Sequence, residues 1–384
     1  MSADQPDTSR VLRPRVLLSG YFSEPTGYGT ASRAYAHAFA EAGMDLTLES
    51  RSPLNESADP LIRSLLDRPL DPEFFISHAE PGVLQAGGRP LHQLIALTTF
   101  ESETLPPPFV QALNRVREVW VPSAHNAQVF ERQLSVPVFR LPHAVNLPPP
   151  ALADPAEINQ LCGLAPSDFV FLSVATWQER KNLAGAIEAF LRAFPDAPGI
   201  KLLLKTSFAF VPLQAALQQV RQRLARLNLP HDGSQALERV RIVDLRLNPA
   251  QMAALMHRAD CYLSLHRGEG WCYPLFDAAC AGTPLVATGY SGPMDYLDPA
   301  SHALVRFAMR PVERGDDPAS FPFSPGQLWA EPDLEHAAAQ MLTVCQNAAQ
   351  IRLQATATAA RLRQEYSFAA VGARACQRLG CIGL

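Results

Sequence analysis

The sequence alternates short apolar runs with amphipathic stretches along most of its length. The apolar runs have the length of strands, and the stretches between them repeat apolar residues at helical spacing. This alternation predicts an α/β fold with parallel sheets that are covered by helices on both faces. In the first half the predicted strands are Arg15–Phe22, Met44–Ser50, Phe74–Ala79, Gln93–Thr99, Glu118–Pro122 and Val136–Leu141. In the second half they are Phe169–Ala175, Lys201–Thr206, Val240–Asp244, Cys261–His266 and Pro284–Thr288.

A proline-rich segment separates the two sets of strands. Residues 148–155 read PPPALADP, which breaks both helices and strands and stiffens the chain. We therefore predict an N-terminal Rossmann-like domain at residues 11–147, a hinge at 148–157 and a second domain at 158–365. Two doubly wound domains joined in this way bind ligands in the cleft between them, at the carboxyl ends of their strands.

Length, charge and cysteine content limit the class of protein that this sequence can encode and the compartment in which it works. A chain of 384 residues is long enough for two domains with sizeable cores, and a net charge of -4 argues against binding nucleic acid through a basic surface. The 7 cysteines are odd in number and form no C-x-x-C pair, a pattern that fits neither a disulfide framework nor a zinc site. The first residues lack the apolar core of a signal peptide, and no apolar stretch has the length of a membrane span. We expect a cytoplasmic protein whose membrane contact is at most peripheral, at the inner face.

The most informative segment is HRGEGWCYPLFDAACAGTPLVATGYSGPMDY, residues 266–296. The strand before it and a helix that Pro274 opens place Glu269 and Gly270 in a strand-to-helix turn. Free backbone N–H groups at such a turn, together with the helix dipole, form a seat for phosphate oxygens. The groups predicted to form it are those of Trp271, Cys272 and Tyr273. We expect Glu269 to accept hydrogen bonds from sugar hydroxyls, and Asp277 to reach a ribose.

Several cations also follow predicted strands. Arg180 and Lys181 precede the predicted helix Leu183–Phe194, so they lie at a helix start, where two cations can neutralise a leaving diphosphate. Lys205 ends a strand that is apolar on both faces, so we expect it to face the cleft and contact phosphate. Asp244 follows the next strand and is expected to approach the nucleotide base. A basic pair in a loop is also a common feature of a solvated surface, so the local sequence leaves that alternative open.

In the first half, glycines and an acid follow the strands. Gly27 and Gly29 are expected in the loop between the first strand and a helix at Ala31–Ala42, where glycine lets the backbone approach a ligand closely. Plain turn chemistry explains the same glycines equally simply. Glu101 follows an apolar strand and is expected near the cleft mouth, with a solvated loop acid as the alternative. We interpret His143 as a hydrogen-bonded structural histidine.

The run EGWCYPLFDA, with seven residues between its two acids, and the following AGTPLVAT resemble the donor motif of the retaining family 4 glycosyltransferases. The resemblance covers most of the chain, is strongest from Phe169 to Asp333, and points to a bacterial polysaccharide-type subgroup. It implies a GT-B fold, and a last helix at residues 366–384 that crosses back to the first domain. This chain departs from the family pattern at Asp277, where the family usually has Glu, and at Thr176, where many members have Arg.

The resemblance also implies an activity. A sugar would pass from a nucleoside-diphosphate donor, GDP-mannose or a UDP-hexose, to a hydroxyl of a saccharide or lipid-linked acceptor, with retained configuration and without a metal ion or other cofactor. It places Gly27 and Gly29 against the donor diphosphate, and Thr30 and Glu101 on the acceptor side. Catalytic roles fall to Glu269, Arg180 and Lys181.

Two other interpretations remain open from the sequence. The same architecture occurs in nucleotide-sugar epimerases, although the segment after Glu269 resembles the transferases more closely. The substitutions at Thr176 and Asp277 would also suit a catalytically silent member that binds a saccharide or a protein partner.

Overall fold

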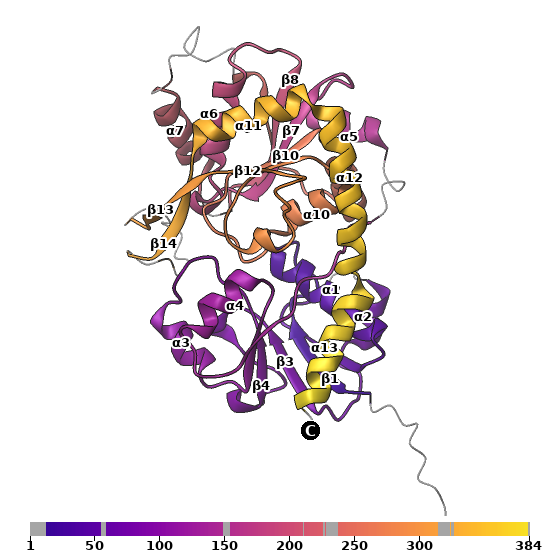
Figure 1. Ribbon diagram of the computed structural model, residues 1–384. Helices are drawn as coiled ribbons and strands as arrows, with labels where there is room; N and C mark the ends of the chain where they lie inside the picture. The colour runs from indigo at the N-terminus through magenta and orange to yellow at the C-terminus, as the bar shows by residue number, and fades with distance from the viewer. Residues whose placement is uncertain are drawn as a thin grey trace, which may run out of the picture.

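The computed structural model describes residues 13–54, 59–148, 154–209, 211–225, 227, 237–313, 323 and 326–382. It contains two six-stranded parallel sheets, one in each half of the chain (Figure 1). The first has the order β2-β1-β3-β4-β5-β6, and the second β12-β11-β10-β7-β8-β9. Both are doubly wound, because the chain runs first toward one edge of each sheet and then toward the other.

Each predicted strand is present, with ends within two residues of the prediction. The first sheet comprises β1 (Arg15–Gly20), β2 (Asp45–Ser50), β3 (Phe74–His78), β4 (Leu94–Leu97), β5 (Glu118–Val121) and β6 (Val138–Arg140). The second comprises β7 (Phe169–Thr176), β8 (Ile200–Ser207), β9 (Val240–Val243), β10 (Cys261–Ser264), β11 (Leu285–Thr288) and β12 (Ala303–Val305). The strands are apolar because helices cover both faces of each sheet, and all four residues of β4 and of β11 are buried.

The sequence patterns did not predict β12 or the antiparallel ribbon of β13 (Phe307–Pro311) and β14 (Leu328–Pro332). The ribbon has one exposed apolar face, so its sequence lacks the continuous apolar run of a buried strand. In Figure 1 it extends from the second half toward the first.

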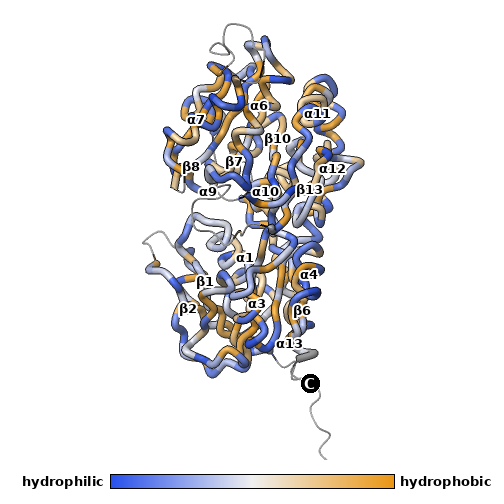
Figure 2. The backbone as a smooth tube through the Cα atoms, turned by 90° about the vertical axis from the view of Figure 1, so that its left-hand side faces the viewer, coloured by the Kyte–Doolittle hydropathy of each residue, from blue (hydrophilic) through white to orange (hydrophobic). Residues whose placement is uncertain are grey.

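Helices lie on both faces of each sheet. In the first half they are α1 (Gly27–Glu41), α2 (Pro60–Leu65), α3 (Pro107–Leu113) and α4 (Ala124–Glu131), with short 3-10 turns at Pro81–Val83 and Leu91–Gln93. In the second half they are α5 (Pro155–Cys162), α6 (Leu183–Ala193), α7 (Leu213–Leu224), α9 (Pro249–Arg258), α10 (Tyr273–Ala281), α11 (Leu334–Gln346) and α12 (Ala348–Glu365), with 3-10 turns η4 (Glu179–Lys181) and η6 (Gly292–Asp295). Along α7, Figure 2 shows alternating hydrophilic and hydrophobic residues, which matches the burial of one side of this helix.

The last helix, α13 (Phe368–Ile382), packs on α1 of the first half. A Cβ added at Gly372 would lie 2.0 Å from the carbonyl oxygen of Ala38, so the two helix backbones touch at this glycine. Farther along, Arg378 Nη2 lies 2.6 Å from Oε2 of the buried Glu118 at the start of β5. The chain therefore returns to the first half after completing the second. Of the predicted hinge, residues 149–153 lie outside the described residues.

Candidate functional site

Glu269 lies in the turn between β10 and α10 and is 4% exposed. Its carboxylate is held by two cations from η4, with Arg180 Nη1 2.9 Å from Oε2 and Lys181 Nζ 2.5 Å from Oε1. Burial alone would raise the pKa of Glu269, but Lys181 and Arg180 outweigh burial and hold the pKa at about 2. A buried carboxylate is thus kept charged between two cations.

The turn that follows β11 completes the support of Glu269. The backbone N–H of Glu269 donates to Ser291 Oγ at 3.0 Å, and the Glu269 carbonyl accepts from Gly292 N at 2.9 Å. Ser291 has φ +64, a left-handed conformation that aims its hydroxyl at the turn. The sequence interpretation did not include Ser291, although it lies in the GYSGP run, whose glycines and proline indicate a tight turn.

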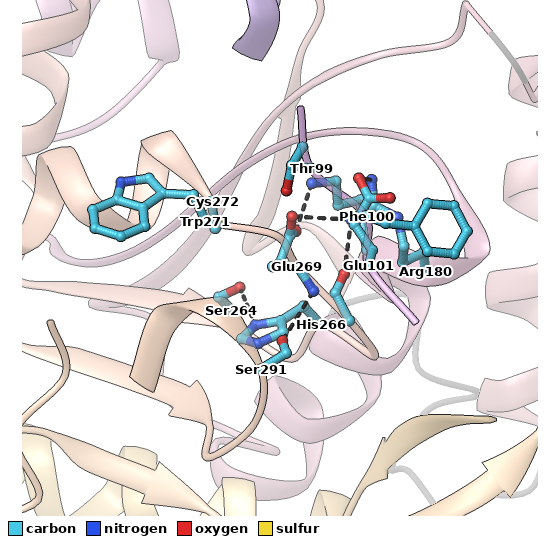
Figure 3. A network of polar contacts seen from close by, with 12 residues as sticks. Thr99, Phe100, Glu101, Arg180, Ser264, His266, Glu269, Trp271, Cys272 and Ser291 are labelled. Atoms are coloured by element: carbon cyan, nitrogen blue, oxygen red, sulfur yellow. Dashed lines mark hydrogen bonds and ion pairs between the residues drawn. The ribbon is translucent and has the colours of Figure 1, made fainter. Parts of the chain in front are cut away.

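Arg180 also connects the two halves of the protein. Its Nη2 lies 3.2 Å from Oε1 of Glu101, which follows β4 in the first half. Figure 3 shows the side chains of Glu101, Arg180 and Glu269 together, whereas Trp271 points away from them. Glu101 is therefore not a solvated loop acid. Burial raises the pKa of its carboxyl above the ordinary value, and Arg180 partly opposes this effect.

Helix α10 begins at Tyr273, with Pro274 in its first turn as predicted. The residue before it, Cys272, has φ 70 and ψ 75, so the chain enters the helix through a left-handed residue without a side-chain cap. The first N–H groups of a helix have no partner within it, and they carry the positive end of the helix dipole. This helix start lies directly after Glu269, where an anionic ligand would meet it.

A small cavity of about 10 Å³, close to the space of a single water molecule, adjoins this cluster at the carboxyl ends of β7 and β10. It is lined by Lys181, Glu269 and Cys272 together with residues 173–175, 183, 186 and 262–265. In doubly wound sheets this end of the strands is where ligands bind. Lys181, the Glu269 carboxylate and the residue before a helix start meet at this cavity, an arrangement that suits a ligand carrying both phosphate and hydroxyl groups.

Asp277 lies one turn into α10. The residue as a whole is half-buried, but its Oδ1 has no solvent contact and no hydrogen-bond partner among the described residues. This buried environment raises the pKa of Asp277 to about 7, with Arg363 opposing the rise. The packing around α10 therefore leaves this oxygen without the partner that buried polar atoms ordinarily have.

The other predicted donor residues of the second half form a separate pair. Lys205, in β8, is half-buried, and this burial lowers the pKa of its ammonium while nearby Asp244 acts in the opposite direction. Lys205 lies opposite Val174 of β7, a residue that lines the cavity. Lys205 and Asp244 thus share the carboxyl edge of the sheet with Glu269 without a direct contact to it among the described residues.

The prediction of a glycine-bearing loop before α1 is wrong. The helix begins at Gly27 instead of Ala31, because Thr26 Oγ1 accepts the N–H of Gly29 at 3.1 Å and caps the helix four residues earlier. A Cβ at Gly29 would lie 2.0 Å from the carbonyl oxygen of Glu24, so this glycine accommodates the preceding loop. Thr30 lies in the same first turn, and its hydroxyl accepts from Arg33 Nη2 at 3.4 Å.

His143 is buried, and its Nδ1 lies 2.8 Å from the hydroxyl of Tyr35. Its ring stacks on Tyr273 at 4.9 Å between centroids. Burial lowers the pKa of His143 well below the ordinary value, which favours the neutral imidazole. This histidine joins α1 to the start of α10.

No family model matches the sequence, and no curated protein matches it. Several solved structures resemble the whole chain. Anabaena Alr3699/HepE in complex with UDP and glucose has a TM-score of 0.64 at 14% identity, over 96% of this chain and 100% of that one. Sucrose-phosphate synthase from Thermosynechococcus elongatus has a TM-score of 0.64 at 14% identity, over 97% and 99%. An alpha,alpha-trehalose-phosphate synthase (UDP-forming) from Burkholderia vietnamiensis has a TM-score of 0.61 at 10% identity, over 97% and 99%. This likeness concerns the fold, and it confirms the predicted GT-B architecture.

The described residues contain no group of three His, Cys, Asp or Glu side chains placed to hold a metal ion. They also contain no helix that is long and apolar enough to cross a membrane.

Proposed function

We propose that this protein is a retaining glycosyltransferase, which moves a hexose from a nucleoside-diphosphate sugar to a hydroxyl of a saccharide or lipid-linked acceptor. The observation that carries the proposal is the buried Glu269 between Arg180 and Lys181, at the start of α10 and beside the cavity. A hydroxyl-binding carboxylate and a phosphate-binding helix start, side by side, match the two ends of a sugar diphosphate.

In the proposed reaction, the bond between the anomeric carbon and the β-phosphate oxygen breaks, and a bond to the acceptor oxygen forms on the same face of the sugar. The acceptor proton passes to the departing phosphate. Negative charge grows on the diphosphate as the bond breaks, and Arg180, Lys181 and the N–H groups of residues 271–273 stabilise it. Glu269 fixes the sugar ring through its hydroxyls.

The remaining roles follow from position. Asp277 accepts a hydrogen bond from a ribose hydroxyl through its unpaired Oδ1. Lys205 contacts the diphosphate, and Asp244 lies toward the base. On the acceptor side, Glu101 and Thr30 lie in the first half, with Glu101 in contact with Arg180.

The neighbouring solved structures support a nucleotide-sugar donor. Anabaena Alr3699/HepE is described with UDP and glucose and also with UDP-glucose, and the trehalose-phosphate synthase is described as UDP-forming. We therefore rank UDP-hexoses beside GDP-mannose as donors to test.

The first experiment is a thermal-shift screen of the purified protein with UDP, GDP, dTDP and ADP and their sugars. A ligand that binds only the folded state raises the melting temperature by mass action. We expect one nucleotide to raise it, and the corresponding sugar nucleotide to be hydrolysed slowly in the absence of an acceptor. If no nucleotide stabilises the well-folded protein, the silent saccharide- or partner-binding member replaces this proposal.

A matched pair of variants then tests the role of the turn. Glu269→Gln keeps the size of the side chain but removes its charge, and a misplaced donor sugar should lower kcat by about 100-fold. The control is Glu335→Gln, because the Glu335 side chain is 86% exposed on α11. Unchanged turnover of a folded Glu269→Gln protein would remove Glu269 from the mechanism.

A further inference from the structure

The segment that follows β4, residues 98–104, crosses from the first half and lies along the turn that carries Glu269. Its Glu101 carboxylate reaches Arg180 at 3.2 Å. Two residues on, Glu103 Oε1 accepts from the hydroxyl of Tyr290 at 2.6 Å, and the Thr104 carbonyl accepts from Gln327 Nε2 at 2.5 Å. Three successive contacts thus fix this segment, called here the crossing segment, to the second half.

Two glycines of the turn lie where the crossing segment approaches. A Cβ added at Gly268 would lie 2.1 Å from the carbonyl oxygen of Glu101, and its three nearest atoms all belong to Glu101. A Cβ added at Gly270 would lie 1.7 Å from Thr99 Oγ1. Neither position has the positive φ that would otherwise require glycine. These glycines therefore leave room for the other half of the protein.

Within the first half, one buried amide holds the crossing segment in shape. Asn126, in the first turn of α4, is 0% exposed. Its Nδ2 donates to the Phe100 carbonyl at 2.5 Å, and its Oδ1 accepts from Thr99 Oγ1 at 2.6 Å. Its backbone N–H donates to Ser123 Oγ at 3.2 Å, so the amide is itself anchored at the helix start. The amide nitrogen and the amide oxygen of Asn126 thus both form hydrogen bonds with the crossing segment.

We propose that the crossing segment is the wall that closes the donor site, that Gly268 is the docking point for it, and that Asn126 is its positioning residue. This inference rests on the proposed function for its effect on turnover, but not for the docking itself. When the segment is docked, Glu101 faces Arg180 opposite Glu269, so the guanidinium is oriented from both halves. When it is undocked, that second carboxylate is absent from the site.

The test is Gly268→Ala, because the added methyl collides only with the opposite half and removes no contact within either half. In small-angle X-ray scattering, the ligand-free full-length Gly268→Ala variant should have a larger radius of gyration than the ligand-free wild type. The affinity for the nucleotide found in the thermal-shift screen should change less than about threefold, since its seat lies within the second half. Hydrolysis of the donor should fall about 100-fold in kcat, the loss expected for catalytic groups misplaced by about 1 Å.

The control is Gly199→Ala, where an added Cβ meets nothing within 4 Å. Asn126→Ala is the second variant, and it should show the same loss of kcat with the same retained nucleotide affinity. Scattering and kcat that match the wild type in Gly268→Ala would overturn the inference. If no nucleotide binds the wild type, the proposed function fails, and the scattering comparison still decides whether Gly268 is the docking point.

Discussion

The unpaired carboxyl of Asp277 predicts that the stability of the folded protein falls as the pH rises. Replacing it by asparagine keeps the shape of the side chain and removes the ionisation. In the folded protein, burial raises the pKa of Asp277 to about 7, whereas the ordinary value is 3.8. The native carboxyl therefore holds its proton over a pH range in which the unfolded chain has released it.

The difference between the native and the unfolded pKa fixes the sign and the size of the pH dependence of stability. A group with a raised native pKa contributes stability that is fully present at low pH and is lost as the pH rises through the native value. Between pH 5 and pH 7 the loss is about 1.4 kcal/mol per pH unit, or about 3 kcal/mol in all. Because Asp277 is half-buried as a residue, we discount this figure for solvent screening to about 2 kcal/mol.

The assay is urea denaturation of the wild type and of Asp277→Asn at pH 5 and pH 8. From pH 5 to pH 8, the free energy of unfolding of the variant should rise by about 2 kcal/mol relative to that of the wild type, because asparagine has no proton to lose. All other titrating groups are common to both proteins and cancel in the comparison. The control is Asp71→Asn, whose side chain is 93% exposed in the wild type. A difference between wild type and Asp277→Asn that does not change with pH would refute the reasoning.

Two further predictions concern contacts between the halves. Arg180→Met should lower the free energy of unfolding by about 3 kcal/mol, because it leaves the buried Glu101 without its cation and Glu269 with only one; urea denaturation at neutral pH measures this. Gly372→Ala should lower it by about 2 kcal/mol, because the new methyl overlaps the Ala38 carbonyl where α13 packs on α1.

Each of these variants has a control within the chain. Arg306→Met should change stability by less than about 1 kcal/mol, since the Arg306 side chain is 72% exposed and its ion pair lies at the surface. Gly380 lies in the same helix as Gly372, but its added Cβ meets nothing within 4 Å, so Gly380→Ala should raise the free energy of unfolding by up to about 1 kcal/mol through helix propensity alone. A stability gain in Gly372→Ala equal to that in Gly380→Ala would show that helix propensity outweighs the overlap with Ala38, against this prediction.

The sequence predicted strands where both faces of the sheet are buried. A central strand such as β4 reads LIAL, because every side chain meets an apolar neighbour, and such a run is visible without knowledge of the fold. The β13–β14 ribbon was missed because its face with Phe307 and Met309 is partly exposed and its pairing depends on the return of the chain at residue 328. Helix α1 begins four residues before the predicted start because the Thr26 side chain caps it, and both glycines then lie within its first turn.

In the candidate site, too, some features follow from the sequence and others only from the tertiary structure. The sequence by itself determined the strand-turn-helix around Glu269, since proline, glycine and an apolar run act over a few residues. Only the tertiary structure decided that Arg180 and Lys181, 88 or more residues earlier in the chain, pair with that carboxylate, and that Glu101 meets Arg180 from the opposite half. The physical reason is that local patterns fix backbone conformation, whereas ion pairs form between side chains that only the packing of two sheets and two halves brings within reach.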